Sequence, residues 1–336
     1  MRVAVTGAAG FIGAKATTEL LDRGHEVVGL DHFGGTSTTD QKRERLARLG
    51  ARDGFRLITG DIRNMADVVR LVGTKPDAVV HLAARGGLRT SMEEPAEFLS
   101  TNVSGFGNVI TATVDAGVGS LVYASSGAVY GGTPAVPFRE NDPAAWPLSL
   151  YGATKRCDEL LAFVYANVAG LRCTGLRFST TYGTDGPPGL AVYTFADRIS
   201  RGEPIDVHGQ GRMVRDFLWG EDAAHAVVLA VEDTGRFRPT AVAGGATGDL
   251  SDAPWRVLNV ATGRSVRLME LISLVEAAVG REATLNLLDA GTAEVQENRM
   301  DTEALHRGLG FKPSVTVEEG VPKAVDWYLD YLRRPR

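Results

Sequence analysis

A glycine-rich turn stands near the start of the chain, between two segments of different character. The apolar run Val3–Val5 precedes the turn, and a segment with helical periodicity, Ala14–Leu21, follows it. The glycines of the turn are Gly7, Gly10 and Gly13. A strand, a glycine turn and a helix in this order bring backbone N–H groups and the positive end of the helix to one place, which suits a pyrophosphate. Because a chain with 40 glycines contains such triplets by chance, a plain strand-to-helix turn is the alternative.

A carboxylate follows the glycine turn at the spacing that is typical of a dinucleotide site. Asp31 ends a second apolar run, Val27–Asp31, and lies eighteen residues after Gly13. An acidic residue about twenty residues beyond such a turn accepts hydrogen bonds from the adenosine ribose hydroxyls. Its charge also repels the 2′-phosphate that distinguishes NADP from NAD. The turn and Asp31 together predict an NAD site, the alternative being that Asp31 only caps the next turn.

The composition is that of an ordinary globular protein. The chain has 336 residues, of which 44% are hydrophobic and 23% charged, and its net charge of −5 gives no reason to expect a nucleic acid or a membrane surface as a partner. No apolar run approaches the roughly 18 residues that a membrane span needs, and no signal-like segment opens the chain. Two cysteines, Cys157 and Cys173, are too few for a disulfide scaffold and lack metal-ligand spacing. We therefore expect a cytoplasmic protein with no metal site.

Short apolar runs alternate with helical segments over the first half of the chain. The runs are Val3–Thr6, Val27–Asp31, Phe55–Thr59, Ala78–Leu82, Leu121–Ser125 and Cys173–Phe178. This alternation predicts an α/β fold with a doubly wound parallel (Rossmann) sheet in residues 1–182. A smaller, mostly C-terminal α/β substrate lobe is predicted for residues 183–336, interleaved with the first because a strand at 256–261 returns to the main sheet. Residues 236–254 lack periodicity and are expected to form a long loop.

A tyrosine and a lysine lie at a spacing that suits acid–base chemistry. Tyr151 and Lys155 are four residues apart, which places both on one face of a helix. A phenol has a pKa of about 10 in water, so a phenolic base at neutral pH needs a positive charge nearby. Lys155 and the nicotinamide ring of NAD⁺ would supply that charge. Upstream, Ser126 ends an apolar run, where ligands bind in the crevice of an open parallel sheet.

In combination, these features resemble the extended short-chain dehydrogenase/reductase superfamily. Within it the chain is similar to nucleotide-sugar epimerases, and more narrowly to UDP-glucuronate 4-epimerases. The resemblance covers nearly the whole chain and rests on these passages: Gly7–Gly13, Asp31, Asp61-Ile62, His81–Pro95, Ser125-Ser126, Ser149–Lys155, Thr174–Gly183, Gly202–Ile205 and Arg215–Phe217. It implies an NAD-dependent 4-epimerase that oxidises C4 of a nucleotide-diphosphate sugar to a 4-keto intermediate, lets it rotate and reduces it again.

The resemblance also implies roles for individual residues. The cofactor-binding residues would be Gly7, Gly10, Phe11, Ile12, Gly13, Asp31, Asp61, Ile62, Leu82, Ala83, Ala84, Tyr151 and Lys155. The catalytic residues would be Ser126, Tyr151 and Lys155, with Tyr151 as the base. The substrate-binding residues would be Ser126, Thr180, Arg89, Arg215 and Arg299, with the arginines suited to the diphosphate.

The chain departs from uronate epimerases where these hold the sugar carboxylate. In those relatives an arginine stands at the position of Pro187, and hydroxyl residues stand at those of Gly127 and Ala128. A hydrogen bond to a charged group contributes about 1.5–3 kcal/mol, so losing three such contacts weakens carboxylate recognition strongly. The sequence therefore predicts a neutral or modified sugar. The alternative is a UDP-glucuronate 4-epimerase with non-standard carboxylate contacts.

Other activities remain as alternatives. Nucleotide-sugar 4,6-dehydratases and decarboxylases need a titratable side chain after the catalytic serine, and Gly127 and Ala128 provide none. A 4-ketoreductase that uses NADPH is disfavoured by Asp31, and an NAD-binding scaffold without turnover is disfavoured by the intact tyrosine and lysine. Helices expected over Ala96–Ala116 and Tyr151–Ala169 occupy the positions that relatives pair into a dimer interface, so the resemblance implies a homodimer.

Overall fold

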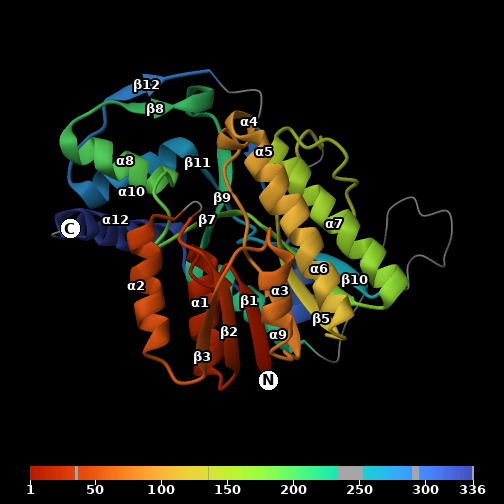
Figure 1. Ribbon diagram of the computed structural model, residues 1–336. Helices are drawn as coiled ribbons and strands as arrows, with labels where there is room; N and C mark the ends of the chain where they lie inside the picture. Colours follow the sequence, from red (N-terminus) through yellow and green to blue (C-terminus); the bar gives the residue numbers. More distant parts are fainter. Residues whose placement is uncertain (35–36, 135, 234–252, 290–294, 335–336) are drawn as a thin grey trace.

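A parallel sheet lies at the centre of the computed structural model, which describes residues 1–34, 37–134, 136–233, 253–289 and 295–334 (Figure 1). All neighbouring strands in this sheet run parallel. In spatial order the seven strands found among these residues are β10 (Trp255–Val260), β6 (Arg172–Phe178), β5 (Ser120–Ser126), β4 (Ala78–His81), β1 (Arg2–Thr6), β2 (Glu26–Asp31) and β3 (Phe55–Thr59). This order confirms the predicted doubly wound parallel sheet.

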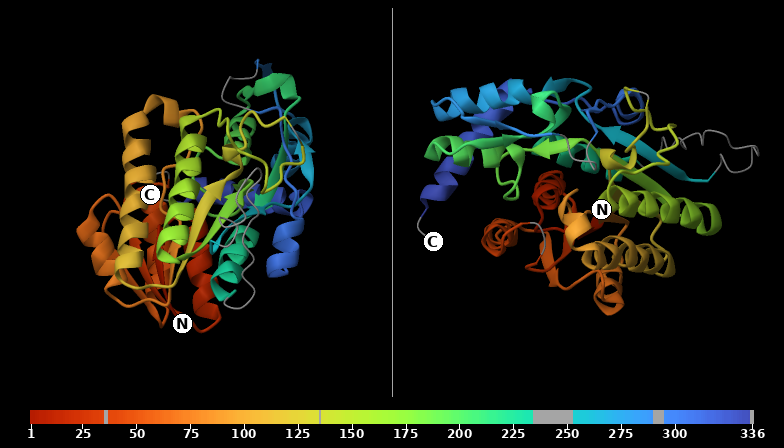
Figure 2. Two further views of the ribbon diagram at one scale, coloured as in Figure 1. Left: turned by 90° about the vertical axis from the view of Figure 1, so that its right-hand side faces the viewer. Right: turned by 90° about the horizontal axis from the view of Figure 1, so that it is seen from above.

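Helices cover both faces of the sheet, as its almost continuously apolar strands require. Figure 2 shows α6 and α7 on one side of the sheet and α9 on the other. The first side carries α3 (Met65–Val72), α6 (Gly105–Asp115) and α7 (Leu150–Ala169). The second side carries α1 (Phe11–Asp22), α9 (Gly220–Glu232) and α11 (Glu303–Leu309), and α2 (Thr39–Gly50) flanks α1.

The strand order reverses between β1 and β4, and this reversal positions the ligand site. From β1 the chain proceeds outward to β2 and β3, then crosses back to β4 and continues to β5 and β6 on the other side. The connections after β1 and β4 therefore leave the sheet in opposite directions. A crevice opens between them at the carboxyl ends of the strands, where ligands bind in folds of this class.

The helical stretch before β5 is not uniform. α4 (Thr90–Glu93) and α5 (Pro95–Phe98) lead into a π-helical segment, η1 (Leu99–Ser104), which continues as α6. The wider turn of η1 directs Asn102 inward, where its amide accepts a hydrogen bond from the Arg85 backbone N–H at 2.8 Å and donates one to Thr154 Oγ1 at 3.0 Å. One buried side chain thus connects the loop after β4 to α7. Such π turns are frequent at functional sites.

A second lobe begins at the carboxyl end of β6. Its strands are β7 (Thr180–Tyr182), β8 (Ile205–Val207), β9 (Val214–Trp219), β11 (Ser265–Arg267), β12 (Leu285–Leu287) and β13 (Glu297–Asn298). Its helices are α8 (Ala191–Arg201), α10 (Leu268–Val279) and α12 (Val317–Arg333), which pack on one another around a separate apolar core.

The two lobes exchange parts of the chain. β10 lies beside β6 in the main sheet, and α9 packs against α1, although both follow the start of the second lobe in sequence. The assignment of residues 1–182 to cofactor binding and of residues 183–336 to substrate binding stays a prediction, and the fold itself is not divided at this point in the sequence. The loop predicted over residues 236–254 lies almost entirely outside the described residues.

Candidate active site

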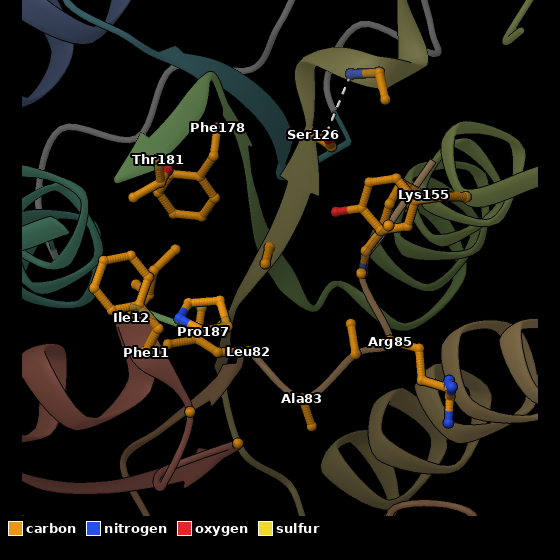
Figure 3. A pocket seen from close by; sticks show the side chains of 18 of the residues that line it. Phe11, Ile12, Leu82, Ala83, Arg85, Ser126, Lys155, Phe178, Thr181 and Pro187 are labelled. Carbon is orange, nitrogen blue, oxygen red and sulfur yellow. Dashed lines mark hydrogen bonds between the residues drawn. The ribbon is translucent and has the colours of Figure 1, made fainter. Parts of the chain in front are cut away.

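A cleft of about 790 Å³ lies between the carboxyl edge of the main sheet and the second lobe (Figure 3). Its walls come from the glycine turn, the ends of β4 and β5, the first turns of α7, and the second lobe. Among the residues predicted for the site, it is lined by Gly7, Gly10, Phe11, Ile12, Gly13, Asp31, Ile62, Leu82, Ala83, Ala84, Ser126, Tyr151, Lys155, Thr180 and Arg215. Segments that lie far apart in sequence thus meet in one cavity of the size that small-molecule ligands need.

The glycine turn has a shape that other residues could not adopt. Gly7 has a φ of +73°, and a Cβ on it would lie 2.6 Å from the backbone N of Ala83. A Cβ on Gly13 would lie 2.0 Å from the carbonyl oxygen of Gly7. The N-cap of α1 is Gly10, which has no side chain to cap the helix, and the first helical residues line the cleft. An uncapped helix start facing a cavity favours an anion, so these residues fit the diphosphate of NAD.

Asp31 lies at the end of β2, where the adenosine ribose of a dinucleotide is expected. Its carboxylate accepts hydrogen bonds from the backbone N–H groups of Ala9 and His32, at 2.8 Å and 2.7 Å, and from Lys42 Nζ at 2.7 Å. A carboxylate has about four acceptor positions, so one is left for a ribose hydroxyl. The role of Lys42 cannot be predicted from the sequence, because a lysine in the polar helix α2 carries no local signal of burial.

The start of α7 places the predicted tyrosine and lysine. Ser149 caps the helix, since its Oγ accepts a hydrogen bond from the Gly152 N–H at 3.1 Å. Tyr151 then lies in the first turn and Lys155 one turn further on. The buried ring of Phe98 meets the Tyr151 ring edge-on, with centroids 6.4 Å apart, and limits its orientation.

Lys155 is held in the protein with only 1% of its side chain exposed. Burial by itself lowers the pKa of an amine. The carboxylate of Asp158 and the nearby Tyr151 act in the opposite direction, and the pKa of Lys155 is raised above its ordinary value. Lys155 therefore carries a positive charge beside the phenol of Tyr151, as a phenolic base requires.

Ser126 ends β5, and the residues that follow it, Gly127 and Ala128, also line the cleft. Its Oγ accepts a hydrogen bond from the Ala128 N–H at 3.2 Å, which caps the short 3₁₀ helix η2 (Gly127–Val129). Figure 3 shows Ser126 and Lys155 on the same side of the cavity. A hydroxyl group here can hydrogen-bond a substrate oxygen that lies against Tyr151.

A buried network beneath the site joins α7 to the sheet. Glu159 accepts hydrogen bonds from Arg177 Nε and Nη2, both at 2.8 Å, and from Ser125 Oγ at 2.6 Å. Arg177 also donates to the Tyr130 hydroxyl at 2.8 Å. Because Ser125 is on β5 and Arg177 on β6, the network ties the helix that carries Tyr151 to both strands.

His81, at the end of β4, is excluded as the base. Its ring is completely buried and bonds through Nδ1 to Thr6 Oγ1 at 2.8 Å. Burial, together with the charge of Lys155, lowers the pKa of His81 to about 3. The ring is therefore neutral over the whole physiological range, and the titratable group available near the end of β5 is Tyr151.

Three predicted residues do not line the cleft. The Asp61 carboxylate is held by Arg63, whose Nη2 lies 2.7 Å away, while its neighbour Ile62 does line the cleft. Arg299 is 45% exposed, with its Nε 3.4 Å from Glu297 Oε1. Arg89 precedes the short helix α4 and is also absent from the lining. Direct contacts of Asp61, Arg89 and Arg299 with ligands therefore stay predictions.

The cleft has no cation at Pro187 and no hydroxyl at Gly127 or Ala128. In the view of Figure 3, Pro187 lies by Phe11 and Leu82. A Cβ on Gly127 would lie 2.8 Å from Met300 Cε, so an apolar side chain fills that space. The polar groups that line the cleft include the Thr180 and Thr181 hydroxyls. Arg85 also lines the cleft and is paired with Glu94.

The glycine turn, Asp31 and the Ser126, Tyr151 and Lys155 side chains meet in one crevice. This arrangement is that of a dinucleotide-dependent enzyme of the short-chain dehydrogenase/reductase type. The sequence profile of the NAD-dependent epimerase/dehydratase family matches residues 3–242. The chain belongs to this family.

Similar proteins match over nearly the full length of the chain. A protein of Rhizobium meliloti named "Probable UDP-glucuronate 4-epimerase" is 37% identical over 340 residues, covering 99% of this chain and 98% of that protein. The crystal structure of a Bacillus cereus UDP-glucuronic acid 4-epimerase with UDP-glucuronic acid and NAD matches with a TM-score of 0.88 and 27% sequence identity. The match covers 98% of this chain and 100% of that one. The structure of the Thermotoga maritima UDP-glucose 4-epimerase with UDP-glucose matches with a TM-score of 0.85 and 27% sequence identity. This match covers 99% of this chain and 100% of that one.

Two further properties of the described residues bear on the class of protein. No group of three or more His, Cys, Asp or Glu side chains among them is arranged to hold a metal ion. In the same part of the chain, no helix has both the length and the apolar character needed to cross a membrane.

Proposed function

We propose that this NAD-dependent enzyme is a nucleotide-sugar 4-epimerase and that its substrate is UDP-glucuronate. The observation that carries the proposal is the meeting of Ser126, Tyr151 and Lys155 with the glycine turn in one cleft. The substrate comes from the relatives, because UDP-glucuronate 4-epimerases resemble the chain over almost its whole length. These comparisons favour a uronate over the neutral or modified sugar that the sequence predicted.

The residues of the cleft divide the work as follows. Tyr151 accepts the proton of the sugar C4 hydroxyl, and Ser126 holds that oxygen in place by a hydrogen bond. Lys155 supplies the positive charge that favours the phenolate form of the base. When bound, NAD supplies a two-electron acceptor that oxidises C4 and then returns the electrons. Arg215, from the second lobe, holds the diphosphate while the sugar turns its other face to Tyr151.

The same cleft gives a specific reason to keep UDP-glucose as a second candidate. Pro187 supplies no cation, and Gly127 and Ala128 supply no hydroxyl, so a carboxylate would depend on other polar groups of the cleft, such as the Thr180 and Thr181 hydroxyls. A sugar with a neutral C6 hydroxymethyl group needs no such contact. The similar fold of a UDP-glucose 4-epimerase supports this candidate.

Substrate competition will test the proposal. We expect NMR to show conversion of UDP-glucuronate to UDP-galacturonate with a higher kcat/KM than conversion of UDP-glucose to UDP-galactose. In the variant Pro187→Arg, a restored cation should raise the preference for the uronate by about 10- to 100-fold, since a charged hydrogen bond contributes about 1.5–3 kcal/mol. Pro188→Ala is the matched control. If only UDP-glucose is converted, UDP-glucuronate is not the substrate. If neither compound is converted, the substrate is not one of these UDP-sugars.

We also propose that the enzyme is a homodimer, paired through α6 and α7. Leu160, Val164 and Val168 form a stripe at helical spacing on α7, and their exposed fractions are 52%, 52% and 79%. Leu99, 47% exposed, lies on η1, which packs beside α7. An exposed apolar stripe of this kind marks an interaction surface. The cytoplasmic location inferred from the sequence stays a prediction.

The dimer is expected to sediment at about twice the chain mass of 35.8 kDa at micromolar concentration. The variant Val164→Glu should shift it to the mass of one chain, because it places a charge in the middle of the stripe. Val69→Glu, at an equally exposed valine of α3 (52%), should leave the mass unchanged. A wild-type protein that sediments as a single chain would contradict the proposal.

A further inference from the structure

Lys155 has a buried acidic partner on its own helix. Its Nζ donates a hydrogen bond to Asp158 Oδ2 at 2.9 Å, and the two side chains are 1% and 0% exposed. The other oxygen, Oδ1, has no hydrogen-bond partner among the described residues. Asp158 belongs to neither the glycine turn nor the tyrosine–lysine pair, so no pattern in the sequence predicts a role for it.

We propose that Asp158 is a positioning residue of the reaction: it keeps the buried Lys155 amine protonated and fixes it on the face of α7 that lines the cleft. This inference rests on the proposed function only for the role of Lys155 beside Tyr151. The ion pair itself can be examined in the free protein.

Asp158 opposes the effect of burial on the Lys155 amine. A buried amine tends to lose its proton, because the charged form is poorly solvated. Burial accordingly acts to lower the pKa of Lys155, and Asp158 provides the largest effect in the opposite direction, ahead of Tyr151 and Glu159, so that the pKa is raised. Without the Asp158 charge, the pKa of Lys155 would fall and the amine would lose its proton at a lower pH.

Other charged and titratable groups also surround Lys155. Glu159, which follows Asp158 on α7, is already paired with two cations, Arg177 and Arg156, and accepts a further hydrogen bond from the Ser125 hydroxyl. His81, at the end of β4, is neutral because burial lowers its pKa to about 3. The phenolate of Tyr151 loses its negative charge when it accepts the substrate proton, so it cannot balance Lys155 throughout the reaction. Asp158 is therefore the carboxylate that balances the Lys155 charge throughout.

The two neighbouring acids of α7, Asp158 and Glu159, differ in how many hydrogen bonds they accept. Glu159 receives several hydrogen bonds, as a carboxylate with a structural role should. Among the described residues, Asp158 accepts a hydrogen bond only from Lys155, and burial raises its pKa to about 6 although Lys155 acts to lower it. The fold thus tolerates a poorly satisfied carboxylate at the place where the lysine needs it.

Lysine NMR can test this directly, because the chain contains only six lysines. In protein labelled with ¹³C-lysine, the Cε shift of Lys155 reports its protonation, and Lys155→Met identifies the signal. In Asp158→Asn, the Lys155 titration midpoint should fall by about one pH unit or more. Asp158→Glu restores the negative charge and should return the Lys155 titration midpoint most of the way to its wild-type value. Glu221→Gln, which removes the exposed partner of Lys15, should leave the Lys155 signal in place.

Wild-type protein gives an independent readout if the Asn variant does not fold. The Lys155 signal should show a small inflection near pH 6, as Asp158 ionises beside it. A folded Asp158→Asn protein with an unchanged Lys155 midpoint, or a wild-type signal that is flat across this range, would overturn the proposal. Because neither measurement needs a substrate, a failure here is distinct from a failure of the epimerase assignment. With active enzyme, Asp158→Asn should also lose kcat/KM more steeply toward high pH than the wild type.

Discussion

Replacing Tyr151 with phenylalanine should lower kcat for epimerisation by about 10²–10⁴-fold, the range over which a positioned general base accelerates a reaction. The variant loses only the phenolic oxygen, while Lys155, Ser126 and the glycine turn keep their places. Affinity for NAD and for the UDP-sugar should therefore change little. The measurements are turnover by NMR and binding by calorimetry.

Tyr165 provides the matched control, since it stands on the same helix and its hydroxyl bonds to Thr111 Oγ1 at 2.6 Å, away from the cleft. Tyr165→Phe should keep kcat within a few-fold of the wild type and lose only a modest amount of stability. If Tyr151→Phe retained most of the activity, another group would have to be the base, and the mechanism derived above would be wrong.

Replacing Glu159 with alanine should lower the free energy of unfolding by about 3–5 kcal/mol, the usual loss when one partner of a buried ion pair is removed. The guanidinium of Arg177, with 1% of its side chain exposed, would be left in the core without its carboxylate. Denaturant unfolding monitored by circular dichroism will measure the loss. Since the network anchors α7, activity should fall with stability.

Glu26→Ala is the control for this loss. Glu26 pairs with Arg2, but the two side chains are 63% and 44% exposed. An exposed pair contributes about 0–1 kcal/mol, so the two variants should differ by several-fold in destabilisation. Equal losses would show that the network beneath the site does not act as a buried ion pair.

The Glu159 contribution should also depend on pH. Burial acts to raise the pKa of Glu159, but Arg177 and Ser125 outweigh burial, and the pKa is lowered. A carboxyl group whose pKa is lower in the folded state stabilises the protein fully at pH values above its unfolded-state pKa, which is about 4.3 for glutamate. That contribution is lost as the pH falls through the pKa of the folded state. The difference between wild type and Glu159→Ala should therefore shrink in acid.

The elements that could be predicted from the sequence are those with a local signature. The apolar runs of the main sheet became strands at nearly the predicted bounds, because a strand buried on both faces needs a continuous apolar run. The start of α1 was placed at Ala14, whereas the helix begins at Phe11. The N-cap there is a glycine, which carries none of the side-chain signals that mark a helix start.

The features that escaped prediction depend on contacts between distant segments. Lys42 and Asp158 look like ordinary helix-surface charges in the sequence, and both are buried against a carboxylate or an amine of the site. The π turn at Leu99–Ser104 is likewise invisible, since its one extra residue per turn becomes useful only through Asn102 and its partners on other elements. The local sequence patterns were therefore enough to predict where the site lies. The charges within it depend on pairs such as Lys42–Asp31 and Lys155–Asp158, which form only in the folded protein.

The exchange of β10 and α9 between the lobes limits how the chain can be divided. A fragment that ended near residue 182 would leave one edge of β6 unpaired and the apolar side of α1 without its cover. Such a piece would be an unfinished sheet rather than a smaller nucleotide-binding protein. The exchange therefore makes the two lobes one folding unit, because neither can complete its packing without chain from beyond residue 182.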